Sequence, residues 1–256
     1  MMKKELLITL ALLLVPSAHV CAEVKASSTS IQAGYIYQTG SGNIAKIPRL
    51  GHAPVIGLTH NSRYDWGTWG GWARVENPFG INEDAKSGHP NGQVVTYKTN
   101  FDMFYNTGLP GVQVWWGQFS SLNDSVGEMF NSLGMAYGKR MGSWFVRANV
   151  GVEYTIAHNK GKNLDFEGIS GGSSALLATY RLNDRVNLIS RVGYRFAHDD
   201  EFRAYAWNSK DAVNAFIAGS YKITPKLTGK LLWRKVRNWG GNGDTSPLEL
   251  NFEYKL

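Results

Sequence analysis

The stretch Ser143–Ile156, SWFVRANVGVEYTI, decides the fold class. Its apolar and polar residues alternate with a period of two, which places successive side chains on opposite faces of a β-strand. One face carries Trp144, Val146, Ala148, Val150, Val152, Tyr154 and Ile156, and the other carries Phe145, Arg147, Asn149, Gly151, Glu153 and Thr155. We therefore predict a strand with one apolar face and one largely polar face.

The same alternation recurs along the chain, while helical periodicity is nearly absent. It is clear in Val95–Tyr105 and Arg185–Phe196, and again in Leu248–Leu256 at the C-terminus. The pattern predicts an all-β protein of twelve strands. They are expected at residues 29–40, 52–62, 66–77, 93–106, 111–122, 128–140, 143–157, 172–182, 185–198, 211–223, 226–238 and 246–256.

The predicted connections alternate between short and long, which is typical of an antiparallel transmembrane β-barrel. The short ones are Arg63–Asp65, Asn106–Pro110, Met141–Gly142, Asn183–Asp184 and Thr224–Pro225. The long ones lie near Gly40–Gly51, Pro78–Gly92, Asn123–Gly127, His158–Gly171, Asp199–Lys210 and Trp239–Thr245. Because lipid cannot pair free backbone groups, such a sheet must close on itself, with its apolar face outward. A periplasmic sandwich or lectin is the alternative, and its apolar face would point inward.

The N-terminus has the pattern of a secretory signal peptide. Lys3 and Lys4 precede the apolar run Leu6–Val15, and small residues follow before Glu23. We predict cleavage after Ala22, so that residues 1–22 are a signal peptide and residues 23–256 form the barrel of an exported protein. A lipoprotein signal at the single cysteine is disfavoured by the valine before it, and one cysteine excludes an internal disulfide framework.

An outward apolar face places a set of charged residues in the lumen. Its basic members are Arg74, Lys98, Arg147, Arg181, Arg191, Arg195, Lys222, Lys230, Arg234 and Lys255. Its acidic members are Glu76, Asp102, Glu153, Glu249 and Glu253. The excess of cations predicts a pore that concentrates anions. The alternative is that these charges pair across the lumen as structural ladders with little selectivity.

Aromatic residues are expected at the inner face or the mouth of the barrel: Trp72, Trp115, Phe104, Phe145 and Phe216. A ring can stack on a sugar or a nucleobase while polar neighbours fix its orientation. The alternative is that each ring only narrows the pore or covers a turn. We take Trp72 and Trp115, with the basic residues, as the candidate solute path.

Two segments carry a resemblance to a known family of channels. Asn183–Phe196, NDRVNLISRVGYRF, is a turn followed by an arginine-rich strand, and Asn214–Leu256 contains YKITPKLTGKLLWRKV before an alternating final strand. They resemble the oligogalacturonate and sialic-acid porin family, whose members are twelve-stranded barrels with basic lumens. The resemblance implies pore-lining roles for Arg191, Arg195, Lys230 and Arg234. The arginines at 191 and 195 are spaced more widely than the family's tight pair.

Two other segments are similar to the nucleoside-specific Tsx-like family, which also has twelve strands. Tyr64–Pro78, YDWGTWGGWARVENP, resembles an early hairpin of that family, and Gly134–Tyr154 resembles a hairpin of its mid-barrel. This second resemblance implies a nucleoside as solute. We favour acidic mono- or oligosaccharides, because that interpretation agrees with the count of basic residues.

Enzymatic alternatives lack a motif. His158, or His198 with Asp199, near a serine such as Ser174 or Ser209 would make a nucleophilic set, yet no G-x-S-x-G or H-E-x-x-H occurs. Loop acids at 83–84 and 199–201 offer at most a weak calcium site. We predict a non-enzymatic, monomeric channel of the bacterial outer membrane. It is expected to contact lipid and lipopolysaccharide, to bind no nucleic acid, and to need no cofactor or metal ion.

Overall fold

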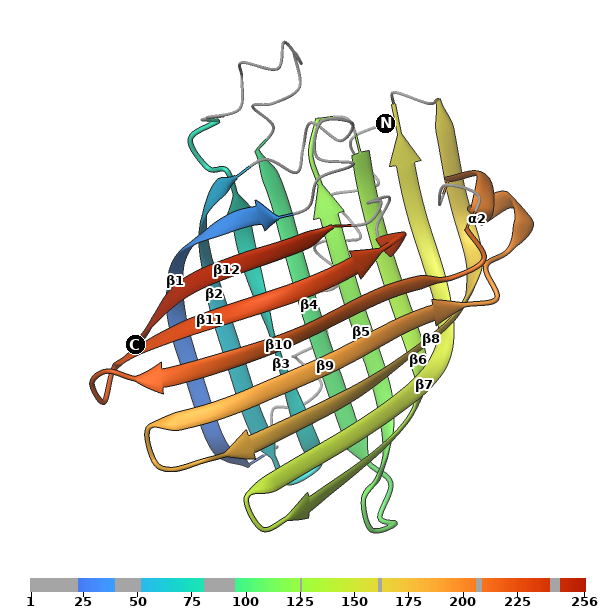
Figure 1. Cartoon of the computed structure of the whole chain (residues 1–256). Helices are drawn as coiled ribbons and strands as arrows, with labels where there is room; N and C mark the ends of the chain where they lie inside the picture. The colour runs from blue at the N-terminus through green and yellow to red at the C-terminus, as the bar shows by residue number, and fades with distance from the viewer. Residues whose placement is uncertain are drawn as a thin grey trace.

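The computed structural model describes residues 23–39, 52–80, 95–124, 126–160, 163–205, 209–239 and 245–256. These residues form one closed antiparallel barrel of twelve strands (Figure 1). The strands are β1 Val24–Thr39, β2 Ala53–Tyr64, β3 Gly67–Glu76, β4 Thr96–Asn106, β5 Val112–Leu122, β6 Val126–Met141, β7 Trp144–Asn159, β8 Leu164–Arg181, β9 Val186–Phe196, β10 Ala212–Lys222, β11 Leu227–Arg237 and β12 Ser246–Lys255. A short helix, α2 (Asp200–Tyr205), lies between β9 and β10. The predicted signal peptide lies outside the described residues.

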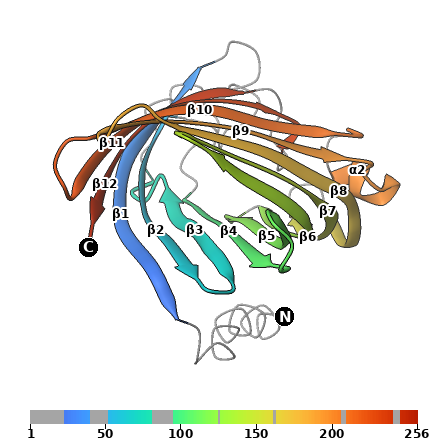
Figure 2. The ribbon, with the colours of Figure 1, turned by 90° about the horizontal axis from the view of Figure 1, so that it is seen from below.

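The sheet closes by pairing its first strand with its last. β1 pairs with β2 along one side and with β12 along the other, with Ile31 opposite both Leu58 and Tyr254. Each strand therefore has two neighbours, and the barrel presents no free edge (Figure 2). Closure satisfies the backbone N–H and C=O groups within the sheet, which is the condition for crossing a bilayer with strands. No helix among the described residues is long and apolar enough to span a membrane.

The apolar face points outward, as predicted. On β7, Val150 and Val152 are 54% and 56% exposed, whereas Glu153, which follows them on the opposite face, is 2% exposed. Leu188, Ile217, Leu231 and Leu250 continue this exposed apolar surface over β9 to β12. A water-exposed apolar surface of this extent is unfavourable, and it matches the lipid-facing band of an outer-membrane barrel. The inward-facing sandwich is therefore wrong.

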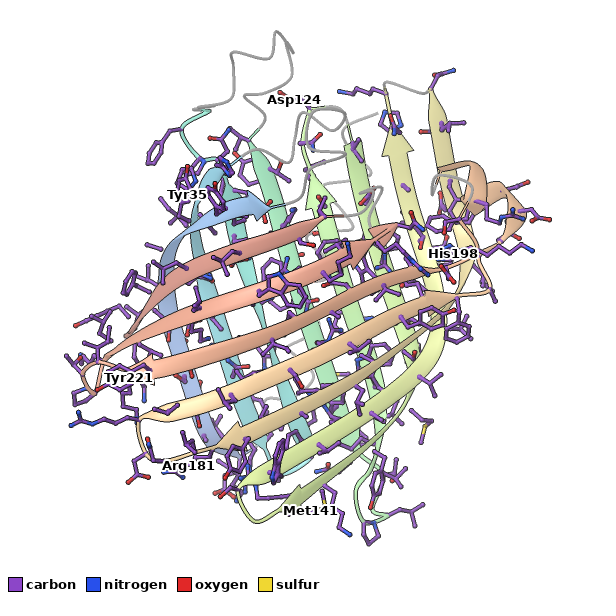
Figure 3. The ribbon with its side chains drawn as sticks, in the orientation of Figure 1. Tyr35, Asp124, Met141, Arg181, His198 and Tyr221 are labelled. Atoms are coloured by element: carbon purple, nitrogen blue, oxygen red, sulfur yellow. The ribbon has the colours of Figure 1, made fainter. Side chains whose placement is uncertain are left out.

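The two rims of the barrel differ. Met141, Arg181 and Tyr221 lie along the rim of short turns, and Asp124 and His198 lie at the opposite rim (Figure 3). The predicted alternation of loop length holds only in part. β5 and β6 are separated by residues 123–125, and β7 and β8 by residues 160–163, so two connections expected to be long are short.

The missing long loop after β7 is strand instead. β8 begins at Leu164 rather than near residue 172, and its pairing with β7 shifts at Glu153 and Tyr154. The inward positions change there from Phe166, Gly168 and Ser170 to Gly171 and Ser173, as in a β-bulge. This change of phase interrupts the period of two, which is why the sequence pattern resembled a loop.

Helix α2 closes part of the lumen at the rim opposite the short turns. Phe202 is 3% exposed and packs with Phe130 and Phe166, at ring distances of 6.2 and 5.1 Å. Val126 and Ala157 complete this mouth cluster, which consists of inward residues of β6, β7 and β8 together with α2. The cluster fills one side of the mouth with apolar side chains.

Candidate functional site

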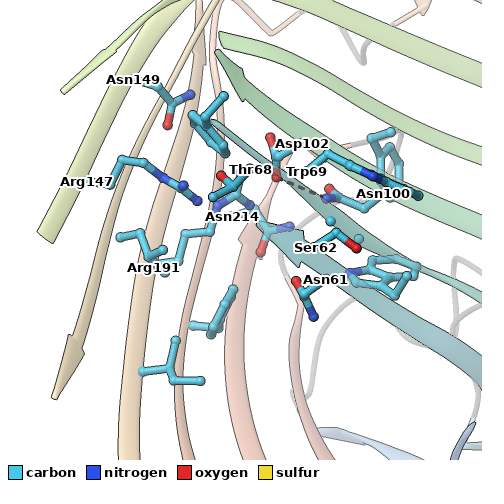
Figure 4. A pocket seen from close by; sticks show the side chains of 18 of the residues that line it. Asn61, Ser62, Thr68, Trp69, Asn100, Asp102, Arg147, Asn149, Arg191 and Asn214 are labelled. Carbon is cyan, nitrogen blue, oxygen red and sulfur yellow. Dashed lines mark hydrogen bonds between the residues drawn. The ribbon is translucent and has the colours of Figure 1, made fainter. Parts of the chain in front are cut away.

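An elongated cavity of about 740 Å³ occupies the lumen. Its lining runs from Ser28 and Arg63, near the rim of short turns, to Val236 and Trp239 near the opposite rim. Figure 4 shows Arg147 and Arg191 on one side of this cavity and Asn100 and Asp102 on the other. The volume suits a small solute such as a monosaccharide or a short oligosaccharide segment.

One wall of the cavity carries paired charges. Arg74 on β3 donates to Glu76 at 2.6 Å and to Glu249 on β12 at 2.9 Å, and all three side chains are nearly buried. Lys98 on β4 contacts the second oxygen of Glu76 at 2.5 Å, and Arg234 on β11 lies 3.7 Å from Glu249. This five-residue network, the paired wall, joins β3 and β4 to β11 and β12. For these five residues the structure shows the alternative given in the sequence analysis, in which lumen charges pair as a structural ladder.

A second buried pair lies closer to the mouth. Arg195 on β9 contacts Glu153 on β7 at 2.9 Å, with 4% and 2% of the two side chains exposed. The guanidinium of Arg195 also lies over the rings of Phe130 and Trp239, at 3.6 and 4.1 Å. Cation–π contact and ion pairing together hold this arginine against the wall. The resemblance implied a pore-lining role for it, whereas its contacts here are those of a packed residue.

The sequence analysis overlooked one acid in this region. Glu128 points inward on β6, is 5% exposed and interacts electrostatically with Arg195. It sat at the first position of the predicted strand, before the alternation was established. Its inward placement could have been found from Phe130 and Ser132, which share its face. The lumen is therefore less cationic than the residue count predicted.

The opposite wall carries arginines of a different kind. Arg147 on β7 is paired with Leu177 on β8 in the strand register, and Leu177 is paired on its other side with Arg191 on β9. Arg191 is paired in turn with Phe216 on β10, and Phe216 is paired with Arg234 on β11. Successive arginines are thus two strands apart, about 10 Å, with an apolar residue between them. This arginine row crosses the wall obliquely, because barrel strands are tilted to the axis.

Two members of the arginine row have no carboxylate partner in the described part of the chain. Neither Arg147 nor Arg191 makes an ion pair there, in contrast to Arg234. Arg147 instead lies 3.4 Å above the ring of Phe104 and 5.8 Å from that of Phe145. A guanidinium stacked on a ring keeps its N–H fork free for a planar carboxylate. Figure 4 shows both arginines extending toward the cavity.

Three predicted path residues lie away from the arginine row. Arg181 pairs with Asp184 in the turn after β8 and is well exposed at the rim of short turns. Lys222 ends β10 at the same rim and is also exposed. Lys230 pairs with Glu253 on the neighbouring β12. The structure therefore separates these cations from Arg147 and Arg191.

The two tryptophans of the predicted path differ in setting. Trp72 borders the cavity and lies under the guanidinium of Arg74, 4.6 Å from its ring centroid. Trp115 is 4% exposed, packs with Phe104 and Ala136, and donates its indole N–H to Asp102 at 2.8 Å. Trp72 has a face available to a solute, whereas Trp115 orients an acid of the wall.

The nucleophilic sets considered from sequence are not assembled. His198 Nδ1 contacts the backbone carbonyl of Ser209 at 2.9 Å, while the hydroxyl of Ser209 donates to the carbonyl of Asp211. His158 pairs with Asp165 at the exposed end of β7. Burial lowers the pKa of His198, and nearby Arg195 lowers it further, against the opposing effect of its backbone hydrogen bond. Among the described residues no group of three His, Cys, Asp or Glu side chains is placed to hold a metal ion.

Comparisons with known proteins agree on the fold. No family model matches the sequence, and the search of curated proteins found no match. The structure of the NanC porin is similar to this chain with a TM-score of 0.56 and 13% identity, covering 89% of this chain and 100% of that one. The KdgM porin matches with a TM-score of 0.50 and 10% identity, over 90% and 99% of the two chains.

An outer-membrane enzyme shares the architecture as well. Outer membrane phospholipase A from Escherichia coli matches with a TM-score of 0.51 and 11% identity, over 88% of this chain and 92% of that one. At these identities the similarity is one of fold. The fold is that of a small twelve-stranded outer-membrane barrel, which confirms at this level the resemblance to small porins noted from the sequence.

Proposed function

We propose that this chain is an outer-membrane channel through which small acidic sugars diffuse passively. The observation that carries the proposal is the arginine row, in which Arg147 and Arg191 face the cavity without a carboxylate partner among the described residues. The three cations of the paired wall already share ion pairs with Glu76 and Glu249. An entering anion therefore meets two guanidinium groups on the wall formed by β7 to β9 that make no ion pair among the described residues, although Asp102 interacts electrostatically with Arg147.

The chemistry of the arginine row favours carboxylates over neutral solutes. A guanidinium presents parallel N–H donors that match the two oxygens of a carboxylate. The spacing of about 10 Å is too long for one carboxylate to bridge Arg147 and Arg191, and it suits a charge that passes from one arginine to the next. Binding that is weak and repeated favours conduction, since a single tight site would hold the solute.

The opposite side of the cavity supplies groups for a sugar ring. Trp72 provides an aromatic face, and Asn61 and Asn100 provide amide donors and acceptors for hydroxyl groups. Asn214 on β10 adds a further amide beside the arginine row. An acidic sugar has one carboxylate for the arginine row and several hydroxyls for the amides. These complementary groups support a uronate or a sialic acid as the solute class.

Purified protein in planar bilayers tests the proposal. We expect single-channel conductance with a preference for anions, and concentration-dependent block of the current by galacturonate at millimolar concentrations. Galactose, which lacks the carboxylate, is the matched control and should block weakly. Stronger block by a nucleoside than by galacturonate would favour the nucleoside alternative, and the absence of any conductance would exclude a channel.

A further inference from the structure

A polar cluster lies on the outer, apolar face of the barrel near the rim of short turns. In the register of β1 and β2, Thr29 is opposite His60 and Ser27 is opposite Ser62. Their side chains share the outward face with Ile31 and Leu58, which lie two residues along each strand and are 44% and 51% exposed. Polar groups on this face are costly in lipid and call for an explanation.

The imidazole of His60 links two hydroxyl groups. Its Nδ1 lies 2.8 Å from Thr29 Oγ1, and its Nε2 lies 2.6 Å from Ser62 Oγ. When Nδ1–H donates to Thr29, Nε2 is left to accept the proton of Ser62. A serine bonded to a histidine that a third group orients is the arrangement of an activated nucleophile. Ser27 Oγ lies 3.1 Å from Ser62 Oγ and adds a second hydroxyl beside the nucleophile.

The cluster lies at the depth of lipid esters. Tyr64, Trp66 and Tyr105 stack at centroid distances of 5.0 and 6.0 Å at the ends of β2 and β4, which marks an interfacial aromatic belt. Ser62 is two residues from Tyr64 along β2, about 7 Å along the tilted strand and therefore about 5 Å deeper into the apolar band. Short turns, the start of β1 and the end of β12 lie at this rim, which is the periplasmic one in barrels of this type. The lipid beside Ser62 is then a glycerophospholipid of the periplasmic leaflet.

Trp69 covers the cluster. It is opposite Ser62 in the pairing of β2 and β3, and its ring lies 4.9 Å from that of His60. Its indole N–H donates to the hydroxyl of Tyr64 at 3.3 Å. The barrel wall is one sheet thick, so Ser62 and Trp69 also border the lumen cavity, but their side chains contact His60 and Phe101 on the outward face. Ser62 is 6% exposed beneath this cover.

We propose that His60 and Ser62 form an acyl-transfer site whose substrate is the ester-linked acyl chain of a glycerophospholipid. Ser62 Oγ attacks the ester carbonyl carbon while its proton passes to His60 Nε2. The tetrahedral intermediate collapses, the C–O bond to the glycerol breaks, and the same proton passes to the departing alkoxide to give a lysophospholipid. Water then hydrolyses the acyl-serine through the same histidine and releases a fatty acid.

Thr29 and Ser27 have different parts in this scheme. Thr29 is a positioning residue, because it acts on the reaction only through the tautomer and orientation of His60. The hydroxyl of Ser27 is placed to donate to the oxyanion that develops beside Ser62. Trp69 must swing aside before an acyl carbonyl reaches Ser62 Oγ. The side chains of the site lie on the opposite face of the sheet from the arginine row, so the proposal does not depend on the proposed channel.

A fluorophosphonate with a long alkyl chain tests the site on the intact barrel in phosphatidylethanolamine and phosphatidylglycerol vesicles. The serine oxygen displaces fluoride from phosphorus, and peptide mass spectrometry locates the adduct. We expect an adduct on Ser62, at least tenfold slower labelling in H60Q, and faster labelling in W69A. Fatty acid release from the vesicles should be lost in S62A, while its single-channel conductance stays that of the wild type.

The chain offers a matched control for this experiment. Ser120 is an outward serine that bonds Thr99 at 2.6 Å without a histidine, so S120A should label like the wild type. Labelling of Ser62 at an unchanged rate in H60Q, or an adduct on another serine, would overturn the proposal. The proposal would also be overturned if neither the wild-type barrel nor W69A were labelled under conditions that fully label a known serine hydrolase. The wild-type and W69A measurements keep the test decisive if H60Q fails to assemble.

Discussion

Both walls of the lumen carry buried or inward arginines, but the arginines of the paired wall form ion pairs and two of those in the arginine row do not. Arg74 on the paired wall has two glutamates within 3 Å and almost no exposed side chain. Arg147 and Arg191 on the wall of the arginine row have Leu177 between them and no carboxylate partner among the described residues. The first arrangement binds strands together, and the second leaves charge for a solute. What separates them is whether a carboxylate lies within reach. Arg74 has Glu76 two residues along its own strand and Glu249 on β12, on the other side of β1 and β2.

This difference explains how a barrel wider than the filled eight-stranded type remains rigid while it keeps a charged path. Strands β3, β4, β11 and β12 are joined across the closure of the barrel by ion pairs with little exposure. The wall of β7 to β9 has one such pair, Arg195 with Glu153 near the mouth. Its other two inward arginines, Arg147 and Arg191, make no ion pair among the described residues.

Removing Glu249 should destabilise the barrel most. The variant E249A leaves Arg74 and Arg234 without a shared carboxylate in a nearly buried setting, which costs about 3 kcal/mol of unfolding free energy. Urea titration of the barrel in bilayers measures this loss. E253A is the matched control, because its pair with Lys230 is more exposed and its loss should be smaller. Equal stability of E249A and the wild type would mean that the paired wall has no structural role.

An acid placed between Arg147 and Arg191 should pair with both arginines and remove their free charge. In L177E the new carboxylate lies directly opposite both Arg147 and Arg191. We expect the ratio of anion to cation permeability to fall several-fold, about 1 kcal/mol in free energy, with assembly retained. L177Q, which has the same shape without the charge, should keep the wild-type ratio. Equal ratios in L177E and L177Q would show that these arginines do not set selectivity.

The smallest expected effect concerns the mouth cluster. The pKa of His198 lies below its ordinary value, so the folded mouth binds a proton less well than the opened one. Packing of α2 is therefore fully present above about pH 6.5 and weakens by less than about 1 kcal/mol as pH falls toward the lowered pKa. Protection factors of residues 198–205 against hydrogen exchange, corrected for the intrinsic exchange rates at about pH 7.5 and about pH 5.5, measure the change. The protection factors of H198Q should not depend on pH in this way, and wild-type protection factors equal at both pH values would contradict the prediction.

The sequence predicted the fold well, because closure in lipid requires a strict period of two. The structure confirms the twelve strands and the outward apolar face, which Val150 and Val152 on β7 illustrate. The pattern failed where that period is broken. The bulge at Ser170 and Gly171 hid the first part of β8, and polar residues before position 29, such as Ser27, hid the start of β1.

The candidate site was harder to predict than the fold. Alternation identified which arginines point inward, but it could not tell that Arg74 shares Glu249 with Arg234, since those contacts depend on register between strands far apart in sequence. The placement of Arg147, Leu177 and Arg191 at one level likewise requires the pairing of three strands. His60 and Ser62, two residues apart, gave a local signal that was overlooked because a motif with glycines was sought.

The reversal potential of the double variant R147A/R191A under a salt gradient tests the central claim most directly. The account predicts that its anion preference falls several-fold relative to the wild type, with assembly unchanged. R181A removes one positive charge at the rim, where Asp184 already pairs it, and should leave the ratio nearly unchanged. An anion preference in R147A/R191A equal to that of the wild type would contradict the account.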